Sequence, residues 1–268
     1  MDPTPAIPAV WAVLFALLYG RGVAVMSRAW PAWRSVCFAL GLVAILAALA
    51  SPIDRLVTEL FSVHMVQHML LTVVAAPLLL LGAPVRPLAQ SLPMSVRRHL
   101  LRPIASSRAL RWLLHLARRP LVAGGLYVVG LYFWHIPTLY DAAVENYALH
   151  VVEHLYFLAS ALLFWSCVID PEPFRSPLPY AARIVYLLLA GAAQNTILGG
   201  LLAFSSRLLY AHYEGRPEAF GLAAVTDQRL GGAIMWVPGD VIFLVAASFA
   251  FFLWLRSEEE AQRMREAR

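Results

Sequence analysis

Lysine is absent from this chain of 268 residues, and cysteine occurs only twice, at Cys37 and Cys167. Without lysine there is no amine for the Schiff base of a retinal pigment, which excludes that class of seven-helix protein. Two cysteines offer no disulfide framework. Charged residues make up only 14% of the chain, whereas 60% of residues are apolar and the mean hydropathy is +0.68. The composition therefore excludes a soluble domain and predicts a polytopic membrane protein.

Seven apolar segments predict membrane-spanning helices. A hydrocarbon layer about 30 Å thick takes about 20 helical residues, and a backbone in lipid must satisfy its own hydrogen bonds. The N-terminal sequence MDPTPAIPAV carries no basic region and no cleavage site, so the first segment is expected to be a retained span. We predict an all-α bundle of seven transmembrane helices in a single membrane domain, residues 1–268, with spans at about 7–25, 33–50, 56–81, 120–134, 147–169, 181–204 and 233–255.

All basic residues are arginines, and their distribution predicts the orientation of the chain. The segments on the side of the C-terminus hold seventeen arginines, Arg28 and Arg268 included, and the opposite side holds four. The positive-inside rule therefore predicts an N-terminus outside and a C-terminus in the cytoplasm. Eight arginines and no acidic residue lie in segment 82–119, which is expected to contact anionic lipids at the cytoplasmic surface. The net charge of +5 reflects this topology and indicates no nucleic-acid partner.

Two of the apolar segments each carry a pair of histidines four residues apart. The pairs are His64 and His68 in FSVHMVQHMLL, and His150 and His154 in ALHVVEHLYFL. Positions i and i+4 share one face of a helix, and a histidine inside a membrane span is costly enough to indicate a function. In the predicted orientation both pairs lie in the outer half of the membrane. Two such faces form a nitrogen-rich metal site if the two helices are neighbours.

Other polar and sulfur-bearing side chains are expected at a similar depth. Polar groups that are distant in sequence but converge at one depth are typical of a buried site. The candidate accessory ligands or hydrogen-bond partners are Met65, Met69, His135, Glu153, Gln194, Asp227, Gln228, Met235 and Asp240. The acidic members are expected to act as counter-ions, to orient a histidine, or to take part in proton transfer or docking.

Copper is the metal that these residues favour. Imidazole suits copper, zinc, iron and nickel, and methionine thioethers add affinity for Cu(I), although the oxidation state stays open. A haem between two helices needs one axial histidine from each, which leaves the i+4 partners without a role, so haem is disfavoured. A di-iron site would need more carboxylates. The remaining alternative is that each histidine only forms a hydrogen bond to a neighbouring helix.

Several sequence blocks resemble a known family. The blocks are HMVQHMLL, APLLLLGAP, WHIPTLYDAA, HVVEHLYFLASALLFW, ILGGLLAF, LYAHY and DQRLGGAIMW, in this order between Leu56 and Leu255. Together they are similar to the bacterial seven-span cytochrome c oxidase assembly protein (CtaG) family of caa3-type oxidase assembly. The resemblance implies a multi-pass protein of the bacterial plasma membrane that helps to assemble haem-copper oxidase. It does not extend to the single-span copper chaperone that sometimes carries the same name, because this chain lacks that topology and a paired-cysteine motif.

The residues and the resemblance together lead to a functional hypothesis. His64, His68, His150 and His154 are expected to bind copper reversibly and to deliver it to the copper-haem centre of the oxidase, without catalysis. The expected partners are oxidase subunit I and extracytoplasmic copper chaperones. Two alternatives stay open: a membrane oxidoreductase that uses the same histidines for redox chemistry, and a metal-free scaffold that holds oxidase subunits during assembly.

Overall fold

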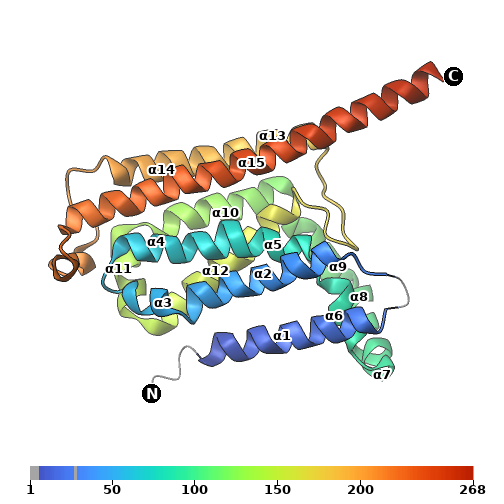
Figure 1. The fold of residues 1–268 in the computed structure, drawn as a ribbon, viewed down its shortest axis with the longest axis horizontal. Helices are drawn as coiled ribbons and strands as arrows, with labels where there is room; N and C mark the ends of the chain where they lie inside the picture. The colour runs from blue at the N-terminus through green and yellow to red at the C-terminus, as the bar shows by residue number, and fades with distance from the viewer. Residues whose placement is uncertain (1–5, 27–28, 268) are drawn as a thin grey trace.

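The computed structural model describes residues 6–26 and 29–267 and is built of helices (Figure 1). Helices make up 81% of it, and the described ranges contain no strand, which confirms the predicted all-α class. Residues 1–5, Arg28 and Arg268 lie outside the described residues. The first half of the sequence MDPTPAIPAV, on which the prediction of a retained span rests, and two of the counted arginines therefore fall outside the structure's description.

The first three predicted spans correspond to two single helices and one composite helix. These are α1 (Ala6–Ala24), α2 (Ala32–Leu49), and α4 (Phe61–Met69) continued by the π-helix η1 (Leu70–Ala75) and α5 (Ala76–Leu81). A short helix, α3 (Pro52–Leu56), separates α2 from α4. Its N-cap is Ser51, whose Oγ accepts a hydrogen bond from the Ile53 amide at 3.1 Å. The helix that carries the first histidine pair therefore begins at Phe61 and not near residue 56.

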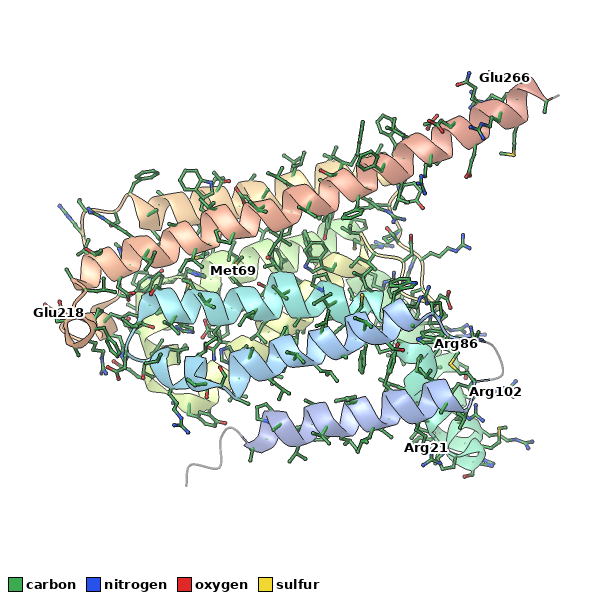
Figure 2. All side chains as sticks on the ribbon, in the orientation of Figure 1. Arg21, Met69, Arg86, Arg102, Glu218 and Glu266 are labelled. Carbon is green, nitrogen blue, oxygen red and sulfur yellow. The ribbon has the colours of Figure 1, made fainter. Side chains whose placement is uncertain are left out.

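The arginine-rich segment folds into short helices at one end of the bundle. They are α6 (Val85–Ser91), α7 (Met94–Val96), the π-helix η2 (Arg97–Leu101), α8 (Arg102–Ser106) and α9 (Arg108–Ala117). Figure 2 shows Arg21, Arg86 and Arg102 at this end and Glu218 at the opposite end. The helix α9 exposes Trp112 and Leu113 beside its arginines, as expected of a helix at a membrane surface.

The second half of the chain contains a broken helix and the longest helix. It comprises α10 (Pro120–Trp134), α11 (Pro137–Glu145), α12 (Tyr147–Ser166), α13 (Tyr180–Tyr186), the π-helix η3 (Leu187–Ala192), α14 (Ala193–Ala203), the 3₁₀ turns η4 (Ala211–Tyr213) and η5 (Pro217–Phe220), and α15 (Ala224–Glu266). The axes of α10 and α11 differ by 81°. Within the described ranges, six helices are long and apolar enough to cross a membrane, or seven if α10 and α11 together form one span.

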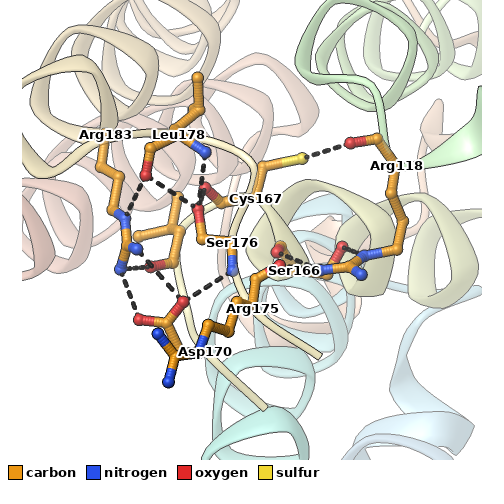
Figure 3. A network of polar contacts seen from close by, with 9 residues as sticks. Arg118, Ser166, Cys167, Asp170, Arg175, Ser176, Leu178 and Arg183 are labelled. Atoms are coloured by element: carbon orange, nitrogen blue, oxygen red, sulfur yellow. Dashed lines mark hydrogen bonds and ion pairs between the residues drawn. The ribbon is translucent and has the colours of Figure 1, made fainter. Parts of the chain in front are cut away.

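Close helix approach and a polar network hold the bundle together. Gly199 of α14 faces Gly232 of α15, and these small residues allow the two backbones to pack closely. At the arginine-rich end, Arg183 pairs with Asp170 at 3.0 Å. Arg118 donates hydrogen bonds to the carbonyl of Ser166, the last residue of α12, and to that of Arg175, between α12 and α13 (Figure 3). The end of the bundle opposite this network contains α3, α11 and the start of α15 (Figure 1).

Candidate metal centre

The two histidine pairs occupy equivalent positions in two helices. In α4, which begins at Phe61, and in α12, which begins at Tyr147, the histidines lie three and seven residues after the first residue. At 1.5 Å per residue, each pair lies about 4.5 and 10.5 Å along its helix. Both helices begin at the end of the bundle away from the arginine-rich helices (Figure 1). The pairs are therefore level with each other.

The four imidazole rings form a single group. One ring nitrogen from each of His64, His68, His150 and His154 lies within 4.8 Å of the other three. The Nε2 atoms of His64 and His150 are 3.1 Å apart. Ring centroids are 4.3 and 4.1 Å apart within the pairs, and 5.0 and 5.4 Å apart between the helices. Three of the rings are buried and His150 is half-buried, so the two helix faces meet inside the protein.

A chain of hydroxyl groups orients His64. Its Nδ1 lies 2.5 Å from the Tyr140 hydroxyl, which lies 3.2 Å from the Tyr213 hydroxyl. Tyr213 donates to the Val57 carbonyl at 2.7 Å, and burial raises the pKa of this hydroxyl, which therefore stays a donor. Since a carbonyl only accepts, all three contacts are satisfied when Nδ1 donates to Tyr140 and Tyr140 donates to Tyr213. This arrangement leaves a lone pair on Nε2 of His64, which accepts a hydrogen bond from Nε2 of His150 at 3.1 Å and points toward the other histidines.

A buried amide orients His154 in a similar way. Gln67 donates from Nε2 to the Ala48 carbonyl at 2.9 Å and to Asp54 at 3.0 Å. Its Oε1 therefore faces His154 and accepts a hydrogen bond from Nε2 of that ring at 3.0 Å. The hydrogen of His154 is thus on Nε2, and its Nδ1 keeps a free lone pair.

His68 and Glu153 are the members of the site that lack hydrogen bonds. Neither ring nitrogen of His68 and neither carboxylate oxygen of Glu153 has a partner among the described residues, although both side chains are buried. The His68 Nε2 and Glu153 Oε1 atoms are 3.8 Å apart, which is beyond hydrogen-bond distance. Buried polar groups normally have partners, so this pair needs an additional one. A cation between the rings would satisfy the imidazole and offset the carboxylate charge.

The nitrogen spacing suits a metal ion after a small closure. Metal–nitrogen bonds of about 2.0–2.1 Å in a tetrahedral site hold the nitrogens roughly 3.3–3.4 Å apart. The pair at 3.1 Å is already near this spacing. Separations of up to 4.8 Å would have to shorten by roughly 1.5 Å for all four nitrogens to bind one ion. The four histidines therefore form a group that can hold a metal ion.

Asp227 lies at the start of the helix that carries His64 and His68. Its carboxylate accepts hydrogen bonds from the amides of Phe61 and Ser62, at 2.6 and 3.3 Å, and from the Ser62 hydroxyl at 2.5 Å. A negative charge at a helix N-terminus satisfies free amides and interacts favourably with the helix dipole. Asp227 therefore stabilises the start of α4, three residues before His64.

Three other candidate residues form hydrogen bonds outside the four-histidine group. Gln228 accepts from the Leu209 amide at 2.7 Å and donates to the Arg207 carbonyl at 3.0 Å, and so holds the chain before η4. Gln194 accepts from the Tyr132 hydroxyl at 3.0 Å. Asp240 accepts from the Thr196 hydroxyl at 2.5 Å, which links α15 to α14.

The remaining candidates line a small cavity beside the histidines. Met65, Met69, His135 and Met235 share its wall with His68. These four residues therefore lie next to the four-histidine group at its His68 corner.

Sequence reasoning overlooked three residues that orient the histidines. Tyr140, Tyr213 and Gln67 each form a hydrogen bond to a histidine of the group. Gln67 had a local signal, because it is a polar residue between two histidines of an apolar helix. Tyr140 and Tyr213 lie outside the straight apolar helices, and only the fold brings them to His64.

Comparison with known proteins identifies a matching family. The sequence model of the family described as cytochrome c oxidase caa3 assembly factor (Caa3_CtaG) matches residues 17–257, which include every histidine of the group.

Three mycobacterial proteins are similar to the chain over most of its length. An uncharacterized protein of Mycobacterium bovis and one of Mycobacterium tuberculosis are each 28% identical over 255 residues, and one of Mycobacterium leprae is 27% identical over 256 residues. Each match covers 92% of this chain and 38% of the relative, so the chain spans less than half the length of these curated relatives. No solved structure matches the chain significantly.

Proposed function

This chain belongs to the cytochrome c oxidase caa3 assembly factor family, and on that premise we propose that it carries copper to the oxidase. The copper is cargo, held between His64, His68, His150 and His154 and passed on to the copper-haem centre. The role is one of binding and release and involves no turnover. The expected location is the bacterial plasma membrane.

The observation that carries this proposal is a buried set of nitrogen donors beside an unpartnered carboxylate. The hydrogen bonds to Tyr140 and Gln67 leave one lone pair on His64 and one on His154 for a metal. His68 and Glu153 have no hydrogen-bond partner within the described part of the chain. Four neutral imidazoles and one carboxylate around Cu⁺ would give a site without net charge, which is the form that a low-dielectric interior tolerates best.

The proposed partners follow from the family and from the position of the group. Oxidase subunit I is the expected acceptor, and extracytoplasmic copper chaperones are the expected donors. The group lies toward the end of the bundle opposite the arginine-rich helices. If those helices face anionic lipids in the cytoplasm, the copper lies in the outer half of the membrane. We infer that the acceptor site in the oxidase lies at a similar depth, so that transfer would be lateral.

A copper titration of purified protein tests the binding step. We choose His68→Leu, because this change removes a nitrogen ligand for the metal without breaking a hydrogen bond. His115→Leu is the matched control, since His115 is exposed on α9, far along the chain from both pairs. We expect wild type and the control to bind copper stoichiometrically and His68→Leu to lose it. Equal binding by all three proteins would refute the site.

A second experiment distinguishes copper delivery from the two alternatives. Wild type and His68→Leu are produced in a host that lacks its own copy, and the oxidase is purified for haem and copper analysis. Copper delivery predicts that the variant yields oxidase with haem but without copper. A metal-free scaffold predicts normal copper in whatever oxidase forms, and a redox enzyme predicts oxygen consumption by the purified protein with a reductant; either result would contradict the proposal.

A further inference from the structure

A small, partly enclosed cavity adjoins the four-histidine group and is lined by further side chains that can bind a metal. Its wall is built from α4 and η1, α10, α12, α14 and α15, and it is large enough for a water molecule or a metal ion. His68 is the only one of the four histidines that lines it. The lining residues that bear on its chemistry are Met65, His68, Met69, His135, Asn195 and Met235.

Three polar side chains in the cavity wall have unpaired atoms. His135 uses Nδ1 for a contact of 2.6 Å with the Leu131 carbonyl, and its Nε2 has no partner in the described ranges. The Nδ2 of Asn195 and both ring nitrogens of His68 also have no hydrogen-bond partner among the described residues. All three residues are more than nine-tenths buried. Buried polar atoms normally have partners. Because Nδ1 of His135 donates to a carbonyl, its Nε2 carries a lone pair that a cation in the cavity would satisfy, whereas Nδ2 of Asn195 carries hydrogens and cannot bind one.

Three thioethers supply the soft ligands. Met65 and Met69 reach the cavity from α4, and Met235 reaches it from α15. Gly239 of α15 makes room for this arrangement, because a Cβ at that position would lie 3.0 Å from the terminal carbon of Met69 and would clash with the Asn195 amide. Sulfur ligands of this kind select Cu⁺. They are also neutral, so the occupied site would hold a single positive charge in an apolar wall, which is much less costly than a divalent ion.

We propose that this cavity is a second copper site, specific for Cu⁺, with the sulfurs of Met65, Met69 and Met235 and the Nε2 of His135 as ligands. It adjoins the four-histidine group at His68. The inference rests on the proposed function only for the identity of the cargo, since the ligand set is separate. The protein then holds two copper ions of different ligation: one bound by nitrogen alone and one bound mainly by sulfur.

The test compares ligation and stoichiometry in full-length protein. Cu⁺ is added anaerobically, bound copper is counted, and X-ray absorption detects sulfur ligands. Co²⁺ serves as a separate probe of the four-histidine group, because it favours imidazole over thioether. The test variant is Met65→Leu, Met69→Leu, Met235→Leu, which keeps side-chain volume. The matched control is Met94→Leu, Met264→Leu, at two exposed methionines.

We expect wild type and the control to bind two Cu⁺ ions with sulfur ligation. The triple variant should bind one, without sulfur ligation, and normal Co²⁺ binding by this variant would show that it is folded. His64→Ala, His150→Ala should keep the sulfur-bound copper and lose the other. Wild type without sulfur ligation at any loading, or a triple variant that keeps it, would overturn the inference. If wild type does not bind Co²⁺, the four-histidine site is refuted instead. Failure of the second copper site and failure of the proposed function are therefore distinguishable.

Discussion

The hydroxyl chain behind His64 leads to a prediction about metal affinity. Tyr140→Phe removes the hydroxyl that lies 2.5 Å from Nδ1 of His64 and keeps the shape of the ring. The Tyr213 hydroxyl lies 3.2 Å from the same nitrogen and can take over the hydrogen bond. The single variant is therefore expected to bind copper only slightly less tightly. Tyr140→Phe, Tyr213→Phe removes both partners and frees the imidazole to turn or to change its tautomer.

The magnitude follows from what such partners contribute elsewhere. Loss of the hydrogen bond that orients a metal-binding histidine costs about 10–100-fold in affinity. This corresponds to about 1.4–2.7 kcal/mol, since each factor of ten is about 1.4 kcal/mol. We expect copper affinity to fall by less than about tenfold in Tyr140→Phe and by about 10–100-fold in the double variant. The double variant also loses the hydrogen bond from Tyr213 to Val57, which lowers stability by about 1 kcal/mol.

Competition with a chelator of known copper affinity measures the effect. Tyr210→Phe is the control, because Tyr210 packs against Tyr140, with ring centroids 4.2 Å apart and the rings tilted by 38°, but donates its hydrogen bond to the backbone carbonyl of His135. It should lose a similar amount of stability and keep its affinity. The reasoning is refuted if the double variant binds copper as tightly as wild type. It is also refuted if Tyr210→Phe weakens binding by the same factor.

Three further changes examine charge, capping and packing. Glu153→Gln replaces a buried, unpaired carboxylate by a neutral amide, so we expect the metal-free protein to have a higher thermal midpoint. We also expect the variant to bind copper at least about tenfold more weakly, and an unchanged affinity would show that the carboxylate is not a counter-ion. Asp227→Asn weakens the cap of α4 and should lower stability by about 1–2 kcal/mol in thermal unfolding, and an unchanged midpoint would contradict the capping role. Gly199→Ala would bring a methyl carbon 2.7 Å from a carbonyl oxygen of α15, whereas the added methyl group of Gly200→Ala meets open space. Only Gly199→Ala should therefore lower the thermal midpoint, and equal midpoints for the two variants would argue against this close packing.

Local patterns were sufficient to predict the helical elements. The apolar runs and the scarcity of charge predicted an all-α membrane protein because helix formation in lipid depends on nearby residues. The spacing of His64 and His68, and that of His150 and His154, predicted that each pair shares one face. Local patterns did not place the helix boundaries: the third span was predicted to start near residue 56, but α4 starts at Phe61. Its first amides donate to Asp227, a residue far away in the sequence.

Local sequence patterns could not predict which residues form hydrogen bonds to the histidines. Nothing near His64 in the sequence indicates Tyr140 or Tyr213, which lie on α11 and η4. Asp240 and Gln194 resembled site residues by composition and depth, yet they pair with Thr196 and Tyr132. Side chains on one span face different neighbours around the helix, and depth alone does not separate them.

The sequence by itself determined that this protein is a helical membrane protein with two pairs of imidazoles, each on one helix face, because helical periodicity is a local property of the chain. Only the tertiary structure decided that α4 and α12 lie level and bring the four rings within 4.8 Å. It also decided which of the accessory residues line the adjoining cavity and which lie elsewhere. The physical reason is that the choice of neighbouring helices depends on packing and capping between residues up to 166 positions apart.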